Sequence, residues 1–184
     1  MRYVLGILAT LGLIVLILVL LLRGGGSSNQ PKALRLADYV NDGSSAHFTI
    51  DGPVNADSKH QSVTIDVDAN QVTLTVYKGY EGDTANLQVY PNNPQAYEAF
   101  LKSLQHEGFT THSDNANLKD ETGVCPLGRR NIYSFDNGTK EVLRSWTTSC
   151  GGGSFKGKPG NVRLLFQNQV PDYNKQVVGT NLGN

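Results

Sequence analysis

The sequence predicts an α+β fold: an antiparallel sheet of about six strands, a meander plus a disulfide-linked hairpin, covered by two helices behind one N-terminal transmembrane helix. Residues 62–77 alternate between apolar and polar side chains around a short turn, which predicts one hairpin. Asn137-Gly138 is a strong signal for a second hairpin. Between them, residues 93–107 carry apolar side chains at helical spacing, which predicts a helix packed on the sheet.

The first 23 residues predict a membrane anchor. Residues 3–22 carry no charged side chain, and at a rise of 1.5 Å per residue they would form a helix about 30 Å long, the thickness of a hydrocarbon core. This run is longer than the apolar region of a signal peptide, and Arg23 follows it instead of a small-residue cleavage site. We therefore expect an uncleaved transmembrane helix over residues 1–23, with the lipid bilayer as its partner through residues 3–22.

A linker and one domain are expected after the anchor. Residues 24–32 are rich in glycine and serine, a composition typical of flexible tethers. The remaining residues, 33–184, are enough for one ordinary α+β domain.

The N-terminal half of this domain is predicted to form a meander of strands. Residues 46–51 place Phe48 and Ile50 on one face of a short strand. A two-residue turn at Ala69-Asn70 would place the apolar side chains of the next hairpin on one face, through the pairs Val67–Val72, Ile65–Leu74 and Val63–Val76. Residues 85–90 predict a further strand with three side chains directed inward: Ala85, Leu87 and Val89.

The helix over residues 93–107 has recognisable ends. Asn93 suits the N-cap, Pro94 suits the first helical position, and Gly108 suits a left-handed C-terminal cap. Its inward side would carry Tyr97, Phe100, Leu101 and Leu104.

A second helix is expected over residues 161–169. Val162, Leu165 and Phe166 have helical spacing, whereas a strand with Val162, Leu164 and Phe166 inward is the alternative. Pro159-Gly160 before the segment and Pro171 after it favour the helix.

Two cysteines, Cys125 and Cys150, flank the second predicted hairpin. If Asn137-Gly138 is a two-residue turn, its register continues outward to place Cys125 opposite Cys150, where Cα atoms lie about 4.5 Å apart. That separation suits a disulfide, which would stabilise the fold by roughly 3–4 kcal/mol. Zinc binding or a reactive thiol is a weaker alternative, because the four histidines show no metal-ligand spacing to the cysteines. We expect neither a metal nor a cofactor.

The compartment of the domain follows from two opposing signals. Arg23, Lys32 and Arg35 follow the apolar run, whereas Arg2 precedes it, and this bias favours a cytoplasmic domain. A structural disulfide instead favours an oxidising compartment. Because long domains can be translocated against a charge bias, we expect a single-pass cell-membrane protein with its C-terminal domain outside the cytoplasm.

The same hairpin register brings four side chains to one face as a possible ligand patch: Arg129, Asn131, Arg144 and Trp146. Arg129 would lie opposite Trp146, within reach of a cation–π contact. One interpretation is that this is the buried face of the sheet, with the arginines at its edge. The other is recognition of a carboxylate, a phosphate or a glycan.

Several motifs of known chemistry are incomplete. Residues 152–159, GGSFKGKP, begin like a phosphate-binding loop, but Pro159 stands where Ser or Thr would hold magnesium, so we expect a flexible connector and no nucleotide. Residues 66–70, DVDAN, begin like a calcium loop, but Gln71 replaces its glycine. No nucleophile elbow or carboxylate pair is evident, so an enzyme is less expected than a binding protein, although catalytic groups can converge in space.

Charge is unevenly distributed although the chain is neutral. Residues 24–124 carry 6 basic and 13 acidic side chains, whereas residues 125–184 carry 8 and 3. The two parts are expected to pack together and neutralise each other. The alternative is a basic face for an anionic polymer, formed by Arg129, Arg130, Arg144, Lys156, Lys158 and Arg163.

Four segments together resemble a family of small, single-pass membrane proteins of Saccharibacteria and related Patescibacteria: FTIDGPVNADSKHQSVTIDV, YKGYEG, AYEAFLKSLQHEGF and LFQNQVPDY. The resemblance covers about residues 46–173. It implies a bacterial source and a membrane placement, but no activity and no catalytic residues.

The function expected from these observations is a membrane-tethered extracytoplasmic binding or structural module of the cell envelope. Its partner would be an envelope protein or an anionic polymer. The alternatives are an envelope hydrolase with an unrecognised site and a polyanion-binding surface protein.

Overall fold

The computed structural model describes residues 34–183, except residues 42, 116–117 and 119. Contacts divide the chain into two units, residues 1–34 and 35–184, and the elements below belong to the second. The predicted anchor at 1–23 and the linker at 24–32 lie outside the described residues. None of the helices described within 34–183 is both long enough and apolar enough to cross a membrane.

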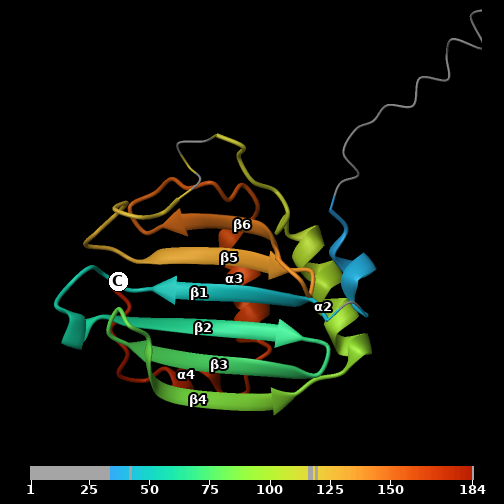
Figure 1. Cartoon of the computed structure of the whole chain (residues 1–184), viewed down its shortest axis with the longest axis horizontal. Coiled ribbons are helices and arrows are strands. Elements are labelled where there is room, and N and C mark those ends of the chain that lie inside the picture. Colours follow the sequence, from blue (N-terminus) through green and yellow to red (C-terminus); the bar gives the residue numbers. More distant parts are fainter. Residues whose placement is uncertain (1–33, 42, 116–117, 119, 184) are drawn as a thin grey trace, which may run out of the picture. The chain divides into compact units, whose positions relative to one another are not determined.

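Six antiparallel strands form one sheet in the spatial order β4-β3-β2-β1-β5-β6 (Figure 1). Strand β1 lies at the centre, where it joins the N-terminal meander to the C-terminal hairpin. The strands are β1 Ser45–Asp51, β2 Gln61–Asp68, β3 Gln71–Lys78, β4 Asp83–Pro91, β5 Arg130–Asp136 and β6 Glu141–Thr148. The prediction of an α+β fold with a six-stranded antiparallel sheet is confirmed.

Helices cover one face of this sheet and leave the other open. The main helices are α2 Pro94–His106 and α3 Pro159–Gln167, and the short ones are η1 Leu36–Tyr39, η2 Asp57–Lys59 and α4 Tyr173–Gln176. In Figure 1, α3 and α4 lie behind the sheet, and its open face is toward the viewer.

Both predicted helices are present with the expected ends. The Asn93 side chain caps α2 by accepting a hydrogen bond from the Ala96 N–H at 2.9 Å. After α2, Gly108 has φ +80°, and the Phe109 N–H turns back to the Leu104 carbonyl at 3.0 Å. Helix α3 starts at Pro159, two residues before the predicted segment.

The hairpin of β2 and β3 has the predicted register. Val67 pairs with Val72, Ile65 with Leu74 and Val63 with Val76. All six side chains are buried on the helix-covered face, because a two-residue turn and a strict alternation of polarity leave only one register that buries them.

Strand β4 is present, but the expected direction of its side chains is wrong. Leu87 and Val89 are each 54% exposed. They pair with Thr75 and Thr73, whose neighbours Leu74 and Val76 face the helices, so Leu87 and Val89 lie on the open face. The β-bulge between Val76 and Tyr77 places Asn86, Gln88 and Tyr90 on the helix side instead.

The register predicted for the hairpin of β5 and β6 is also wrong. Tyr133 pairs with Ser145, not with Val142. One reason is the Asn137 side chain, whose Oδ1 accepts hydrogen bonds from the Thr139 N–H at 3.2 Å, the Thr139 hydroxyl at 2.8 Å and the Lys140 N–H at 3.1 Å. These bonds stabilise a loop over residues 137–140 in place of the two-residue turn, which shifts the register by two residues. A β-bulge between Phe135 and Asp136 shifts it by one more, so the total shift is three residues.

The predicted disulfide between Cys125 and Cys150 is present, with Cα atoms 5.8 Å apart. It does not arise from strand register, because both cysteines lie beyond the ends of β5 and β6. Two turns bring them together, one closed by the Gly128 N–H to the Cys125 carbonyl and one by the Gly151 N–H to the Thr148 carbonyl. Gly128 is required here, since a Cβ atom would lie 2.2 Å from the Ser149 Oγ.

The core lies between the sheet and the two main helices. The ring of Phe48 in β1 lies 5.3 Å from Tyr133 in β5 and 5.5 Å from Phe166 in α3. Phe166 also meets Phe100 of α2 edge-on at 5.1 Å. Because Phe166 joins both helices to the sheet, its replacement by alanine is expected to cost about 3–5 kcal/mol.

The outer edge of β6 is covered by the segment after the disulfide. The Phe155 N–H donates to the Trp146 carbonyl, and the Trp146 N–H donates to the Ser154 hydroxyl. The Phe155 ring stacks on Tyr133 with centroids 4.4 Å apart. This glycine-rich segment is therefore packed in place, contrary to the expectation of a flexible connector.

Candidate functional site

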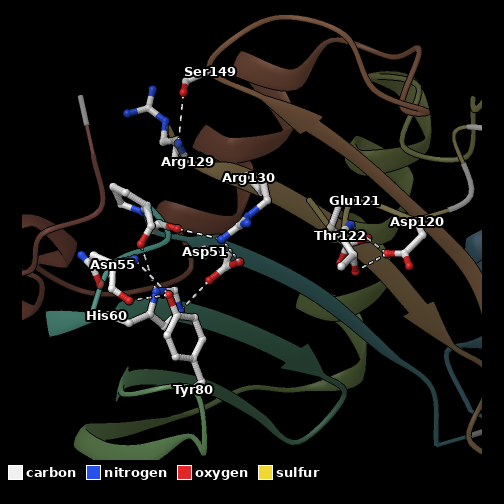
Figure 2. Close-up of polar contacts among 12 residues, drawn as sticks. Asp51, Asn55, His60, Tyr80, Asp120, Glu121, Thr122, Arg129, Arg130 and Ser149 are labelled. Atoms are coloured by element: carbon white, nitrogen blue, oxygen red, sulfur yellow. Dashed lines mark hydrogen bonds and ion pairs between the residues drawn. The ribbon is translucent and has the colours of Figure 1, made fainter. Parts of the chain in front are cut away.

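The consecutive residues Arg129 and Arg130 have different surroundings. Arg130 begins β5 on the open face of the sheet and is 5% exposed. Its Nη2 lies 2.6 Å from Asp51 Oδ2 and donates to the Gly52 carbonyl at 2.8 Å (Figure 2). Arg129 precedes the strand, and its backbone N–H donates to the Ser149 hydroxyl at 3.0 Å.

Asp51 also binds His60, and this contact completes a polar network at the end of the sheet. His60 Nε2 lies 3.0 Å from Asp51 Oδ1, and Nδ1 lies 3.2 Å from the Pro53 carbonyl oxygen. Tyr80 stacks on the imidazole with ring centroids 4.1 Å apart. Both ring nitrogens therefore face acceptor atoms within the protein. The Asp51–Arg130–His60 network is therefore structural.

A cavity of about 410 Å³ lies on the other side of the sheet, between the ends of β5 and β6 and the start of α3. We call it the arginine cavity. Its lining residues are Arg129, Asn131, Tyr133, Thr147, Thr148, Ser149, Gly151, Gly152, Pro159, Gly160 and Arg163.

Three elements position the polar side chains of the arginine cavity. Asn131 and Thr147 pair across β5 and β6 on the helix-covered face, and Asn131 Nδ2 donates to Thr147 Oγ1 at 3.3 Å. Arg163 comes from the first turns of α3, next to the buried Val162. The disulfide of Cys150 holds the turn that forms the third wall.

The electrostatics of the cavity are dominated by two guanidinium groups without carboxylate partners. In the part of the chain that the structure describes, neither Arg129 nor Arg163 forms an ion pair with Asp or Glu. Arg129 Nη1 donates to the Gly183 carbonyl at 3.2 Å. Burial raises the pKa of the Tyr133 hydroxyl, while its hydrogen bond with Thr147 and the charges of Arg163 and Arg129 oppose that rise.

Two atoms of the arginine cavity are buried without a hydrogen-bond partner. Among the described residues, six side-chain atoms have this status, and two of them belong to residues that line the cavity: Asn131 Oδ1 and Arg163 Nε. Buried polar atoms of folded proteins are nearly always paired, so these two residues are exceptions within one small region.

The structure keeps half of the predicted ligand patch together. Arg129 and Asn131 both line the arginine cavity. Arg144 and Trp146 lie on the open face, because Trp146 pairs with Ile132 and Arg144 with Ser134. The predicted contact between Arg129 and Trp146 is therefore wrong, and the three-residue shift of register explains it.

The two displaced residues have local partners. Trp146 is 2% exposed and donates from Nε1 to the Leu118 carbonyl at 2.8 Å. Arg144 pairs with Glu121 and, at 3.6 Å, with Glu141. Leu118 and Glu121 belong to the loop before β5, so Trp146 and Arg144 both hold that loop against the sheet.

Arg163 is the member of the site that strand alternation could not identify. It appeared in the sequence only as one of six basic residues of a possible basic face. Three of those six pair with carboxylates: Arg130 with Asp51, Arg144 with Glu121, and Lys158 with Glu107 at 3.1 Å. The sequence does not show how α3 packs on the sheet, so it could not assign Arg163 to the patch.

The open face carries a second polar cluster around His47. Its Nδ1 lies 2.5 Å from Asp66 Oδ1, and its Nε2 lies 3.0 Å from Asp136 Oδ2 and 2.8 Å from the Ser45 hydroxyl. Burial lowers the pKa of His47, but the hydrogen bonds and charges of Asp66 and Asp136 outweigh burial, so the pKa is raised above 6.5. This cluster joins three strands. In the described part of the chain, no group of three or more His, Cys, Asp or Glu side chains is arranged to hold a metal ion.

Comparisons with known proteins add no assignment. No protein-family model matches the chain, and no curated protein is significantly similar to it.

Proposed function

We propose that this protein is a membrane-tethered, extracytoplasmic binding module of the cell envelope, and that its ligand carries an anionic group held by Arg129 and Arg163. The observation that carries the proposal is Arg163, which lines the cavity with no hydrogen-bond or ion-pair partner among the described residues. A guanidinium is always charged, and a partly buried charge is destabilising unless it is paired. An anionic ligand would supply the missing partner.

The residues of the cavity favour binding over catalysis. Its lining contains hydroxyl groups, including those of Thr147 and Ser149, but no Asp, Glu, His or Cys. A hydroxyl nucleophile needs an adjacent general base. Arginine cannot serve as one, because it does not lose its proton in proteins.

A titration with small anions tests this proposal. The full-length chain in neutral detergent micelles would be titrated with acetate and with inorganic phosphate, while the amide signals of Gly151 and Gly152 are followed by NMR. Arg163→Gln should abolish saturable shifts at these glycines. Arg144→Gln removes the same charge from the same domain but leaves the cavity intact, so it should keep them. Equal loss in both variants would refute a specific site.

Placement outside the cytoplasm needs its own test. Protease added to intact cells should cleave in the 24–32 linker and release the domain. Labelling of Cys125 and Cys150 by a thiol reagent without prior reduction would contradict this placement.

Salt dependence separates the cavity from a polyanion-binding surface. When basic side chains neutralise phosphates of a polymer, log affinity falls linearly with log salt, by nearly one unit of slope for each contact. Steep salt dependence with DNA or a teichoic-type polymer, reduced in Arg129→Ala and in Arg144→Ala, would favour the polymer. The cavity predicts instead that Arg144→Ala has no effect.

A further inference from the structure

We infer that two copies of this chain pair edge to edge through strand β4, so that their two sheets continue into one. This inference concerns a different surface from the arginine cavity and does not depend on a ligand there. Strand β4, Asp83–Pro91, forms one edge of the sheet. Among the described residues β3 is its only strand partner, and no element lies along its outer side in Figure 1.

The two edges of the sheet differ in how they are covered. At the other edge, β6 is covered by the segment after the disulfide, through the hydrogen bond from the Phe155 N–H to the Trp146 carbonyl. Natural proteins protect free edges with charged side chains, prolines or bulges, because unpaired N–H and C=O groups can pair with another chain. In β4 the bulged Ala85 and Pro91 lie toward the two ends. The stretch between them, residues 86–90, contains no charged side chain.

The backbone groups of Leu87 and Val89 point away from β3. Hydrogen-bonded and non-hydrogen-bonded pairs alternate along an antiparallel ladder. The Asn92 N–H donates to the Asn70 carbonyl at 2.8 Å. In the same register the even-numbered residues from 86 to 90 bond to β3, whereas Leu87 and Val89 occupy the non-hydrogen-bonded positions. The N–H and C=O groups of these two residues are therefore presented at the free edge.

The side chains beside this edge are apolar and exposed. Leu87 and Val89 lie on the open face and are each 54% exposed. On the other face, the Asn86 side chain donates to the Gln176 carbonyl at 3.3 Å, and Val178, two residues later, is 79% exposed. A free strand with exposed apolar side chains and no charge in its centre is typical of an edge that pairs with another chain.

A second copy of the chain fits this edge. An antiparallel pair of identical strands has a two-fold axis, so both copies use the same surface. With the axis at Gln88, Leu87 of each copy lies opposite Val89 of the other, and the four apolar side chains meet on the open face. Each of these pairs exchanges two backbone hydrogen bonds.

The two neighbouring registers are less favourable. An axis at Leu87 would place Val89 opposite Ala85, the bulged residue. An axis at Val89 would place Leu87 opposite Pro91, which has no N–H to donate. The pairing about Gln88 is therefore the register that the strand itself selects.

Pairing through β4 also limits the assembly to two copies. The joined sheet would end at β6 on both sides, and each of those edges is covered by its own chain. A closed two-fold assembly leaves no equivalent edge for a third copy. The arginine cavity lies at β5 and β6, so this interface would not cover it. An interface made by one pair of strands is small, and we therefore expect a weak dimer.

Sedimentation of the full-length chain in neutral detergent micelles, at protein concentrations up to about 1 mM, tests the pairing. The unaltered chain should shift from monomer to dimer as its concentration rises. Leu87→Lys brings like charges together at the interface, so it should raise the dissociation constant about tenfold or more. Leu164→Lys is the matched control, because Leu164 of α3 is 52% exposed and lies outside the interface. It should leave the dissociation constant unchanged.

A cysteine at the axis tests the register. In the proposed pairing the Cα atoms of the two Gln88 residues lie about 4.5 Å apart, within reach of a disulfide. Gln88→Cys should therefore form a covalent dimer under mild oxidation. Thr84→Cys, on the same strand, is the control and should not, because the two copies of this residue would be about 26 Å apart along the joined strands.

Three outcomes would overturn the inference. A chain that stays monomeric over the whole concentration range would leave an extended segment of another protein as the occupant of the edge. A dimer that Leu87→Lys does not weaken would be formed by another surface, such as the predicted anchor. Equal crosslinking of Gln88→Cys and Thr84→Cys would contradict an axis at Gln88. None of these results changes anion binding at Arg163, so the proposed function is tested separately.

Discussion

Arg130 and Arg163 lie on opposite faces of the same sheet and differ in their partners. Arg130 is 5% exposed and lies against Asp51 and the Gly52 carbonyl. Arg163 lines a cavity and has no partner among the described residues. Arg130 also retains one unpaired atom, Nε, but its charge is neutralised by Asp51.

This difference in partners indicates that Arg130 stabilises the fold and that Arg163 is available to bind a ligand. A charge that is paired inside the protein contributes to stability when its partner is present, and removal of either partner leaves the other uncompensated. A charge without a partner adds no favourable interaction to the fold and is available to an external anion. Substitution of a paired group should therefore lower the free energy of unfolding, whereas substitution of Arg163 should lower the affinity for the ligand.

The largest expected effect is at Asp51. Asp51→Ala leaves the buried Arg130 without a carboxylate and removes the partner of His60, so the free energy of unfolding should fall by about 3–5 kcal/mol. Urea unfolding of the full-length chain in micelles, followed by Trp146 fluorescence, measures this change. A loss below about 1 kcal/mol would show that the network does not support the fold.

The disulfide is expected to have the next largest effect. Replacing Cys125 and Cys150 together with serine should cost about 3 kcal/mol, because the crosslink closes a loop with a sequence separation of 25 residues. The turn that contains Gly151 and Gly152 should also become less fixed, so ligand affinity should fall together with stability. Unchanged affinity in a destabilised double variant would separate the cavity wall from the disulfide.

The two hairpins show which parts of the fold the sequence could predict. The register of β2 and β3 was predictable because the alternation of polarity on both strands agrees with a two-residue turn, and the Asp68 side chain closes that turn by accepting from the Asn70 and Gln71 N–H groups. The register of β5 and β6 was not, because the Asn137 side chain binds Thr139 and Lys140 in a longer loop and a β-bulge follows at Phe135 and Asp136. Neither the longer loop nor the bulge is visible in the alternation of the strands.

The candidate site was predictable only in part for a similar reason. Arg129 and Asn131 have the same parity along one strand, so any register keeps them on one face. Arg144 and Trp146 depended on the register across the hairpin and were separated by its shift. Arg163 depended on how α3 packs on the sheet, which no local pattern encodes. The disulfide was predicted correctly although its assumed register was wrong, since two turns bring the cysteines together.

A smaller effect is expected at His47, a group paired with two carboxylates. Because its pKa is raised in the folded protein, the stabilisation is fully present below about pH 6.5 and is lost as the pH rises through the folded-state pKa. Asp66, Asp136 and the Ser45 hydroxyl face the ring, and these partly exposed pairs contribute roughly 1 kcal/mol or less. Stability measured by urea unfolding at increasing pH should therefore decline across this window, and His47→Gln should flatten the decline. An equal decline in the variant would assign it to other groups.

The smallest effect on stability is expected at Arg163, where the comparison is most easily refuted. Arg163→Gln removes a partly buried charge that has no partner, so the free energy of unfolding should fall by no more than about 0.5 kcal/mol and is expected to rise. Arg130→Gln is the matched substitution on the other face and should cost about 3–5 kcal/mol, because it leaves Asp51 without its arginine. Saturating acetate should raise the unfolding midpoint of the unaltered protein and of Arg144→Gln but not that of Arg163→Gln, because a ligand stabilises only a protein that binds it. A large loss of stability in Arg163→Gln would show that this arginine has a partner within the protein after all, and the argument for a ligand at the cavity would lose its main support.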